Sequence, residues 1–101
     1  MGKLIKMSKI SKEKEAKIMS DILNVLFQNS PKALFTADVS RFITRDEEYI
    51  KRLLEELESK ELVIPVKKNS LGFDYKKRIK WRLSDKAYTT YKAIQEGKPV
   101  L

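Results

Sequence analysis

Basic, aromatic and acidic side chains recur at helical spacing between residues 45 and 52, in a pattern suited to an anionic surface. At 100° per residue, a helix over this stretch places positions 45, 48, 49 and 52 on one face. Arginine and lysine can donate to phosphate oxygens or guanine, tyrosine to a phosphate or base edge, and glutamate can accept from cytosine N4. In the alternative interpretation these are solvated surface residues that pair with nearby glutamates. The candidates are Arg45, Glu48, Tyr49, Lys51 and Arg52.

Residues 66–82 form a second, strongly basic stretch. The stretch contains seven lysines and arginines and a single acid, Asp74, so it carries a net charge of +6. Neutralising phosphates releases counterions and requires no fixed geometry, which suits a basic hairpin. Alternatively, the charges only protect an exposed sheet edge from aggregation. The candidate phosphate-binding residues are Lys67, Lys68, Lys76, Lys77, Arg78 and Lys80.

Three apolar residues interrupt this basic stretch: Leu71, Phe73 and Tyr75. They either fold back onto the core, enter a minor groove as apolar wedges, or touch a partner subunit. The sequence leaves these three roles open.

Asp46, Glu47 and Glu48 form an acidic run that raises the question of carboxylate catalysis. A catalytic pair needs a cleft and a partner group, and the sequence shows neither. Thr44 and Glu47 instead fit a capping box at a helix start, where the helix dipole also favours acids. The chain has no His, no Cys and only three Gly, with no phosphate-binding loop. We therefore predict no enzyme activity, no metal site and no cofactor.

The overall charge points to a polyanionic partner. The chain has 101 residues, 22 basic against 14 acidic, and a formal net charge of +8, which fits one basic domain. Nucleic acid is the first candidate partner and an anionic membrane surface the second. No apolar run approaches the roughly 20 residues of a membrane span, and no secretory signal is visible. We expect an intracellular, nucleoid-associated protein, and the Lys- and Glu-rich, Cys-free composition favours a thermophilic source.

Helical periodicity and stop signals define the first half of the domain. A helix is predicted over 12–28, capped by Ser11 and stopped before Pro31. Leu34 and Phe35 fit a minimal strand. Thr36 is predicted to cap a short helix over 37–43 that buries Val39, Phe42 and Ile43. Thr44 would then cap a helix over about 45–60, whose core-facing stripe is Ile50, Leu53, Leu54 and Leu57.

Strand signals follow, and then a final helix. Residues 62–68 read as an edge strand because Pro65 cannot donate to a ladder. Residues 78–83 alternate, with Ile79, Trp81 and Leu83 inward. Ser84 is predicted to cap a helix that runs to about residue 96. Domain organisation is predicted as a basic arm over 1–10, one domain over 11–97, and a tail over 98–101.

This order of helix, strand, helix, helix, β-hairpin and helix resembles the winged helix-turn-helix domain, a mainly helical α+β fold. The residues that carry the likeness are 34–39, 44–57, 61–64 and Trp81-Arg-Leu-Ser-Asp-Lys-Ala87, similar to the family's W-x-L-T-x-K-G exit from the wing. The likeness is closest to small MarR-like and archaeal or archaeal-viral transcription regulators. It implies that helix 45–60 enters a major groove and that the hairpin is the wing. Two departures are a missing Gly between that helix and the wing, at 59–62, and an unusually acidic helix.

The first and last helices carry more apolar surface than one small core needs. Ala87, Tyr88, Tyr91 and Ile94 form an apolar stripe on the last helix, and helix 12–28 has a broad apolar face. We predict that the two helices pack together in part and that the excess forms a homodimer interface. A twofold dimer would match a palindromic site with half-sites one helical turn apart.

These observations favour a sequence-specific, double-stranded DNA-binding transcription regulator. A non-specific architectural DNA-binding protein is the first alternative, since the hairpin alone could grip the phosphate backbone. The second alternative is a winged-helix protein-interaction module that contacts no bases.

Overall fold

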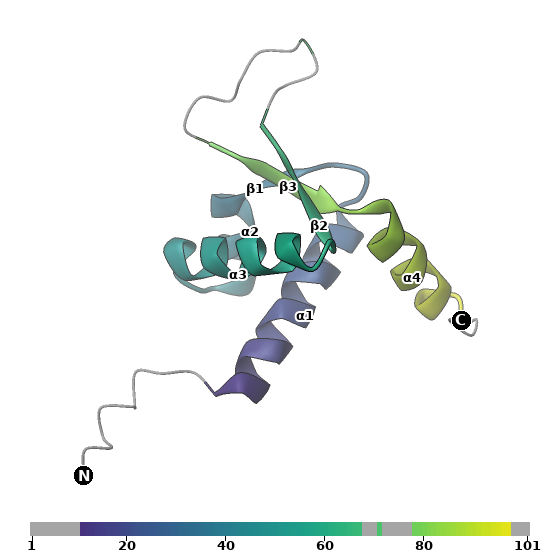
Figure 1. The fold of residues 1–101 in the computed structure, drawn as a ribbon, viewed down its shortest axis with the longest axis horizontal. Helices are drawn as coiled ribbons and strands as arrows, with labels where there is room; N and C mark the ends of the chain where they lie inside the picture. Colours follow the sequence, from purple (N-terminus) through teal and green to yellow (C-terminus); the bar gives the residue numbers. More distant parts are fainter. Residues whose placement is uncertain (1–10, 68–70, 72–77, 98–101) are drawn as a thin grey trace.

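The computed structural model describes residues 11–67, 71 and 78–97, and these form four helices and three strands (Figure 1). In chain order the elements are α1 (Lys12–Gln28), β1 (Leu34–Phe35), α2 (Thr36–Ile43), α3 (Glu47–Ser59), β2 (Val63–Val66), β3 (Lys80–Leu83) and α4 (Asp85–Gln95). This order confirms the predicted α+β winged helix-turn-helix fold. The predicted arm and tail, and Lys68, Phe73, Tyr75, Lys76 and Lys77, lie outside the described residues.

Helix α1 forms where the local signals predict it. The Ser11 hydroxyl accepts a hydrogen bond from the backbone N–H of Lys14 at 3.2 Å. At the other end, the Asn29 amide and the Ser30 hydroxyl donate to the carbonyls of Val25 and Leu26 at 2.8 and 2.9 Å. The helix buries Ile18, Ile22 and Leu26 and packs against α2, α3 and β3. Helix α1 therefore packs at the centre of the contacts that join α2, α3 and the sheet.

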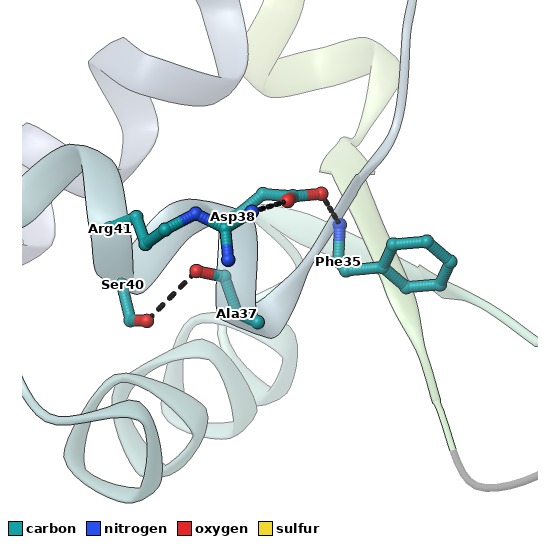
Figure 2. A network of polar contacts seen from close by, with 5 residues as sticks. All are labelled: Phe35, Ala37, Asp38, Ser40 and Arg41. Carbon is teal, nitrogen blue, oxygen red and sulfur yellow. Dashed lines mark hydrogen bonds and ion pairs between the residues drawn. The ribbon is translucent and has the colours of Figure 1, made fainter.

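Helix α2 begins one residue earlier than predicted, and Thr36 does not cap it. The Asp38 carboxylate accepts from the backbone N–H of Phe35 at 3.1 Å and also pairs with Arg41, while the Ser40 hydroxyl donates to the Ala37 carbonyl (Figure 2). Thr36 is the first helical residue, and its hydroxyl accepts from the Trp81 indole N–H at 2.8 Å. Its side chain therefore joins α2 to the sheet instead of closing the helix end.

The turn between α2 and α3 corrects the predicted capping box. Thr44 has φ 61° and ψ 49°, the left-handed conformation, and ends α2 with its N–H donating to the Ser40 carbonyl. The N-cap of α3 is Asp46, whose carboxylate accepts from the backbone N–H of Tyr49 at 3.1 Å. Thr44 therefore ends α2 instead of starting α3, and α3 begins two residues later than predicted.

The end of α3 accounts for the missing glycine. Leu62 N–H donates to the Leu57 carbonyl at 3.0 Å and Glu61 N–H to the Glu58 carbonyl at 2.9 Å, the two bonds of a Schellman motif. Glu61 takes the left-handed position with φ 62°, where glycine is usual. The helix therefore ends in the common way with an uncommon residue.

The three strands form an antiparallel sheet in the order β1-β3-β2. Trp81 and Leu83 of β3 are buried against the helices, and Pro65 lies on the edge strand β2, as predicted. Phe35 and Lys80 are register partners on the opposite face of the sheet. The sheet thus has one face in the core and one face toward solvent.

The core stripe of α3 is confirmed, whereas Phe42 is not buried. Ile50, Leu53, Leu54 and Leu57 are at most 2% exposed. Phe42 is 60% exposed because the buried side of α2 consists of Thr36, Val39 and Ser40, and Phe42 lies off that side.

Helix α4 leads away from the sheet, on the other side of the hairpin strands from α2 and α3 (Figure 1). The Ser84 hydroxyl caps it by accepting from the Ala87 N–H at 3.1 Å. Tyr88 and Tyr91 contact the Phe27 ring of α1, with ring centroids 5.4 and 5.7 Å apart. The predicted packing of the first and last helices is confirmed.

Candidate nucleic-acid interface

The five residues predicted on the face of α3 divide into two groups. Arg45, Glu48 and Lys51 are exposed to solvent. Tyr49 is half-buried, and both Tyr49 and Arg52 contact α1. Four of the five predicted residues are thus exposed, and contact with α1 distinguishes Arg52 from Arg45, Glu48 and Lys51.

Glu15 of α1 holds Tyr49 and Arg52. The Tyr49 hydroxyl donates to Glu15 Oε2 at 3.1 Å, and Arg52 Nη2 lies 3.6 Å from the same oxygen. The Arg52 guanidinium also lies over the Tyr49 ring, 5.0 Å from its centroid. Partial burial and the neighbouring Glu15 carboxylate raise the pKa of the Tyr49 phenol above its ordinary value of 10.0.

Sequence reasoning did not predict this contact. Glu15 and Tyr49 are 34 residues apart. No local pattern links them, because their approach depends on how α1 and α3 cross in the folded core. The sequence signal available was a carboxylate in the first turns of a helix with a broad apolar face.

Helix α3 is acidic overall. Between residues 45 and 60 there are six acidic side chains and four basic ones. Asp46 caps the helix and Glu47 and Glu48 lie in its first turn, where the dipole favours negative charge. A nucleic acid approaching α3 therefore meets basic groups mainly at Arg45 and Lys51, with Arg52 shared with Glu15.

Lys51 lies beside the base of the hairpin. A hollow of about 110 Å³ separates α3 from the start of α2 and the end of the hairpin. Lys51 of α3 and Arg78 of the hairpin base both line it, together with the first residues of α2. Its lining residues are Phe35, Thr36, Ala37, Glu47, Lys51, Arg78 and Ile79. Two cations that are 27 positions apart in sequence thus border one hollow at a helix N-terminus, a geometry favourable to a phosphate.

The base of the hairpin carries cations stacked on an aromatic ring. The Arg78 guanidinium lies 4.1 Å from the centroid of the Phe35 ring, and Lys80 Nζ lies 5.0 Å from it. Lys67 is exposed and directly follows β2, whose last residue, Val66, pairs with Lys80. Lys68, Lys76 and Lys77 lie outside the described residues, and phosphate binding by all six predicted hairpin residues stays a prediction.

Arg82 and Leu71 show two further outcomes for the hairpin. The Arg82 guanidinium donates to the Leu83 carbonyl at 3.0 Å and lies 3.7 Å from Asp85, so it is engaged at the end of the sheet next to α4. Leu71 is 78% exposed, so its side chain does not fold back onto the core.

Metal-binding and membrane-spanning features are missing from the described part of the chain. Across residues 11–67, 71 and 78–97, no group of three or more His, Cys, Asp or Glu side chains could hold a metal ion. None of the helices in these ranges combines the length and apolar character needed to cross a membrane.

Comparison with solved structures shows the same fold in bacterial transcription regulators. MepR, a regulator of the Staphylococcus aureus multidrug efflux pump MepA, matches with a TM-score of 0.60 and 18% identity over 93% of this chain and 62% of MepR. MepR in complex with DNA matches with a TM-score of 0.66 and 16% identity over 92% of this chain and 80% of that one. PcaV from Streptomyces coelicolor, solved with its natural ligand, matches with a TM-score of 0.60 and 18% identity over 92% of this chain and 61% of PcaV.

These similarities establish a MarR-like winged helix-turn-helix fold. This chain spans about three fifths of the full MepR and PcaV chains. No protein-family model matches the sequence, and no curated protein matches it by sequence.

Proposed function

We propose that this chain is a transcription regulator that binds double-stranded DNA through α3 and the hairpin. The observation that carries the proposal is the meeting of Lys51, Arg78 and Lys80 where α3, the start of α2 and the hairpin base adjoin. The diameter of an α-helix such as α3 matches the width of a major groove, and a basic hairpin beside it reaches the flanking phosphates. The shared fold with a MepR–DNA complex supports this arrangement.

Sequence specificity is the finer part of the proposal. Arg45, Lys51 and Arg52 are proposed to contact phosphates or guanine edges, Tyr49 a phosphate, and Glu48 to accept from cytosine N4. Selection of bound duplexes from a random pool, run at two salt concentrations, tests it. We expect one enriched sequence at both concentrations. The absence of an enriched sequence at both salt concentrations would contradict sequence-specific recognition.

A homodimer through α1 and α4 is the second part of the proposal. Tyr88 is 39% exposed and Ile94 is 56% exposed, so the apolar stripe of α4 is only partly covered by α1. Pairing two copies would cover it and place two α3 helices for a palindromic site. Light scattering should give twice the 11.8 kDa mass of one chain. Ile94→Asp should give the single-chain mass, whereas Gln95→Asp, one residue along, should not; a single-chain mass for the wild type would contradict the dimer.

The acidity of α3 favours one alternative, a non-specific architectural DNA-binding protein. With six acids against four basic residues around α3, the hairpin would supply most of the attraction and would read no bases. Affinity for a scrambled duplex equal to that for the best selected site would support this alternative.

A further inference from the structure

Glu15 occupies a position that its role in the fold of α1 does not explain. Its Oε2 atom accepts from the Tyr49 hydroxyl and pairs with Arg52, so one carboxylate oxygen serves two side chains of α3. The Glu15 side chain is 26% exposed, against 60% for Arg52. The partly buried carboxylate is thus the fixed partner, and the arginine is the exposed, adjustable one.

The contact restrains the side chain that α3 would otherwise offer to DNA. Arg52 is one of four basic residues between positions 45 and 60, and its guanidinium is directed toward α1 and stacked on Tyr49. A guanidinium that pairs with a carboxylate adds little net attraction for a phosphate. It must leave or share Glu15 before it can make a bidentate contact.

We propose that Glu15 is a positioning residue that competes with DNA for Arg52. The proposal rests on the proposed DNA-binding function and adds a regulatory contact to it: α1 lowers the DNA affinity of α3 while Glu15, Tyr49 and Arg52 stay together. We call these three residues the Glu15 cluster. Because α1 also belongs to the proposed dimer interface, a partner that shifts α1 relative to α3 changes the availability of Arg52.

The size of the effect follows from the exposure of the pair. Exposed ion pairs are worth only a few tenths to about one kcal/mol, so breaking one should change affinity by roughly twofold to fivefold. Removal of the Glu15 charge also reduces repulsion of phosphates, an effect that any nearby acid would share. The test must therefore separate the release of Arg52 from the loss of a charge.

Glu15→Gln keeps an oxygen acceptor for Tyr49 and removes the charge that holds Arg52. Glu13→Gln is the matched control, since Glu13 is exposed on the same turn of α1 and points to another face. Dissociation constants for a duplex are measured for both variants, each alone and combined with Arg52→Ala. We expect Glu15→Gln to bind about threefold more tightly than Glu13→Gln, and this advantage to vanish in the Arg52→Ala background.

Several outcomes would overturn the proposal. Equal affinities of Glu15→Gln and Glu13→Gln, weaker binding by Glu15→Gln, or an advantage that persists with Arg52→Ala would each do so. The absence of salt-sensitive binding by every variant would instead reject the underlying DNA-binding function.

A readout without DNA tests the cluster itself. The titration of Tyr49 is isolated as the difference in ultraviolet absorbance between a protein with Tyr49 and the same protein carrying Tyr49→Phe. This titration should lie at lower pH in the Glu15→Gln background than in the wild type. The reason is that the Glu15 carboxylate disfavours the tyrosinate through its hydrogen bond and its charge. An unchanged titration would show that the cluster does not form in solution.

Discussion

The base of the hairpin and the outer face of α3 lie side by side but have opposite electrostatic character. At the hairpin base, Arg78 and Lys80 stack on Phe35. On α3, acids outnumber basic residues, and Arg52 is held by Glu15 of α1. Under the proposed function, this difference predicts that the hairpin contributes most of the affinity for DNA and that α3 contributes discrimination among sequences.

Removing the hairpin cations should have the largest effect. Arg78→Ala with Lys80→Ala should weaken binding to every duplex by about tenfold for each phosphate that is no longer neutralised at moderate salt, or roughly a hundredfold together. The slope of log K against log salt concentration should become shallower by about 0.9 for each such phosphate. Fluorescence anisotropy with preferred and scrambled duplexes measures both quantities.

The control for the hairpin variant is Lys86→Ala with Lys92→Ala. These residues belong to α4, which follows the end of β3 opposite to the hairpin, and their replacement removes the same total charge. If the two double variants weaken binding equally, the hairpin base has no special role and only net charge matters.

Arg52→Ala should have a smaller and more selective effect. A bidentate contact to guanine is worth about 1–3 kcal/mol of discrimination, so the loss of affinity should fall mainly on the preferred duplex. Lys60→Ala removes the same charge from the far end of α3 and should affect both duplexes alike. Equal losses of affinity by Arg52→Ala on the preferred and scrambled duplexes would remove the contrast between α3 and the hairpin.

Thr36→Val tests how strongly the helix-turn-helix is joined to the sheet through α2. The Thr36 hydroxyl accepts from the buried Trp81 indole and joins α2 to β3. An unpaired buried donor costs about 1–3 kcal/mol, so the free energy of unfolding should fall by that amount. Thr36→Ser keeps the hydroxyl and should be destabilised much less in the same chemical denaturation experiment. Similar destabilisation of both variants would mean that the threonine methyl, and not the hydrogen bond, stabilises the junction.

Thr44→Gly should give the smallest change, a gain in stability of up to about 1 kcal/mol. A left-handed backbone costs a β-branched residue about 1–2 kcal/mol, and glycine relieves this at some cost in chain entropy. Thr44→Ala keeps the Cβ atom and should not show the gain. Because Thr44 sets the turn into α3, DNA affinity measured beside stability shows whether α3 remains in position. A decrease in the stability of Thr44→Gly would contradict the assigned strain.

Local signals were sufficient for most of the fold. Ser11 and Pro31 bound α1 as predicted, Pro65 marked the edge strand, and the alternation ending at Leu83 located β3. Each of these signals acts within a few residues. These elements therefore formed where the local sequence predicted them.

Predictions failed where packing decided among alternatives that look the same in sequence. The Thr-x-x-Glu pattern at Thr44 fits a capping box, but the crossing of α2 and α3 makes Thr44 a left-handed residue and gives the cap to Asp46. Phe42 is apolar yet exposed, because the buried side of an eight-residue helix is narrow.

The candidate site was only partly accessible to sequence reasoning. Helical spacing grouped Arg45, Glu48, Tyr49 and Arg52 on the side of α3 away from the core, where all but the half-buried Tyr49 are exposed. It missed Glu15, because that contact depends on the packing of two distant helices. The meeting of Lys51 and Arg78 also required the folded sheet. The archaeal or viral and thermophilic source stays a prediction.

The most direct test of the proposed DNA-binding surface is the salt dependence of duplex binding by the wild-type chain, compared with Arg78→Ala plus Lys80→Ala. We predict that log K for the wild type falls linearly with log salt concentration and that the double variant gives a slope shallower by about 0.9 for each phosphate that is no longer neutralised. Both proteins should be folded under the binding conditions, since the lost contacts of Arg78 and Lys80 with Phe35 are worth at most about 2 kcal/mol together. Binding that is absent, or that has the same slope in both proteins, would contradict the claim that the hairpin base holds DNA.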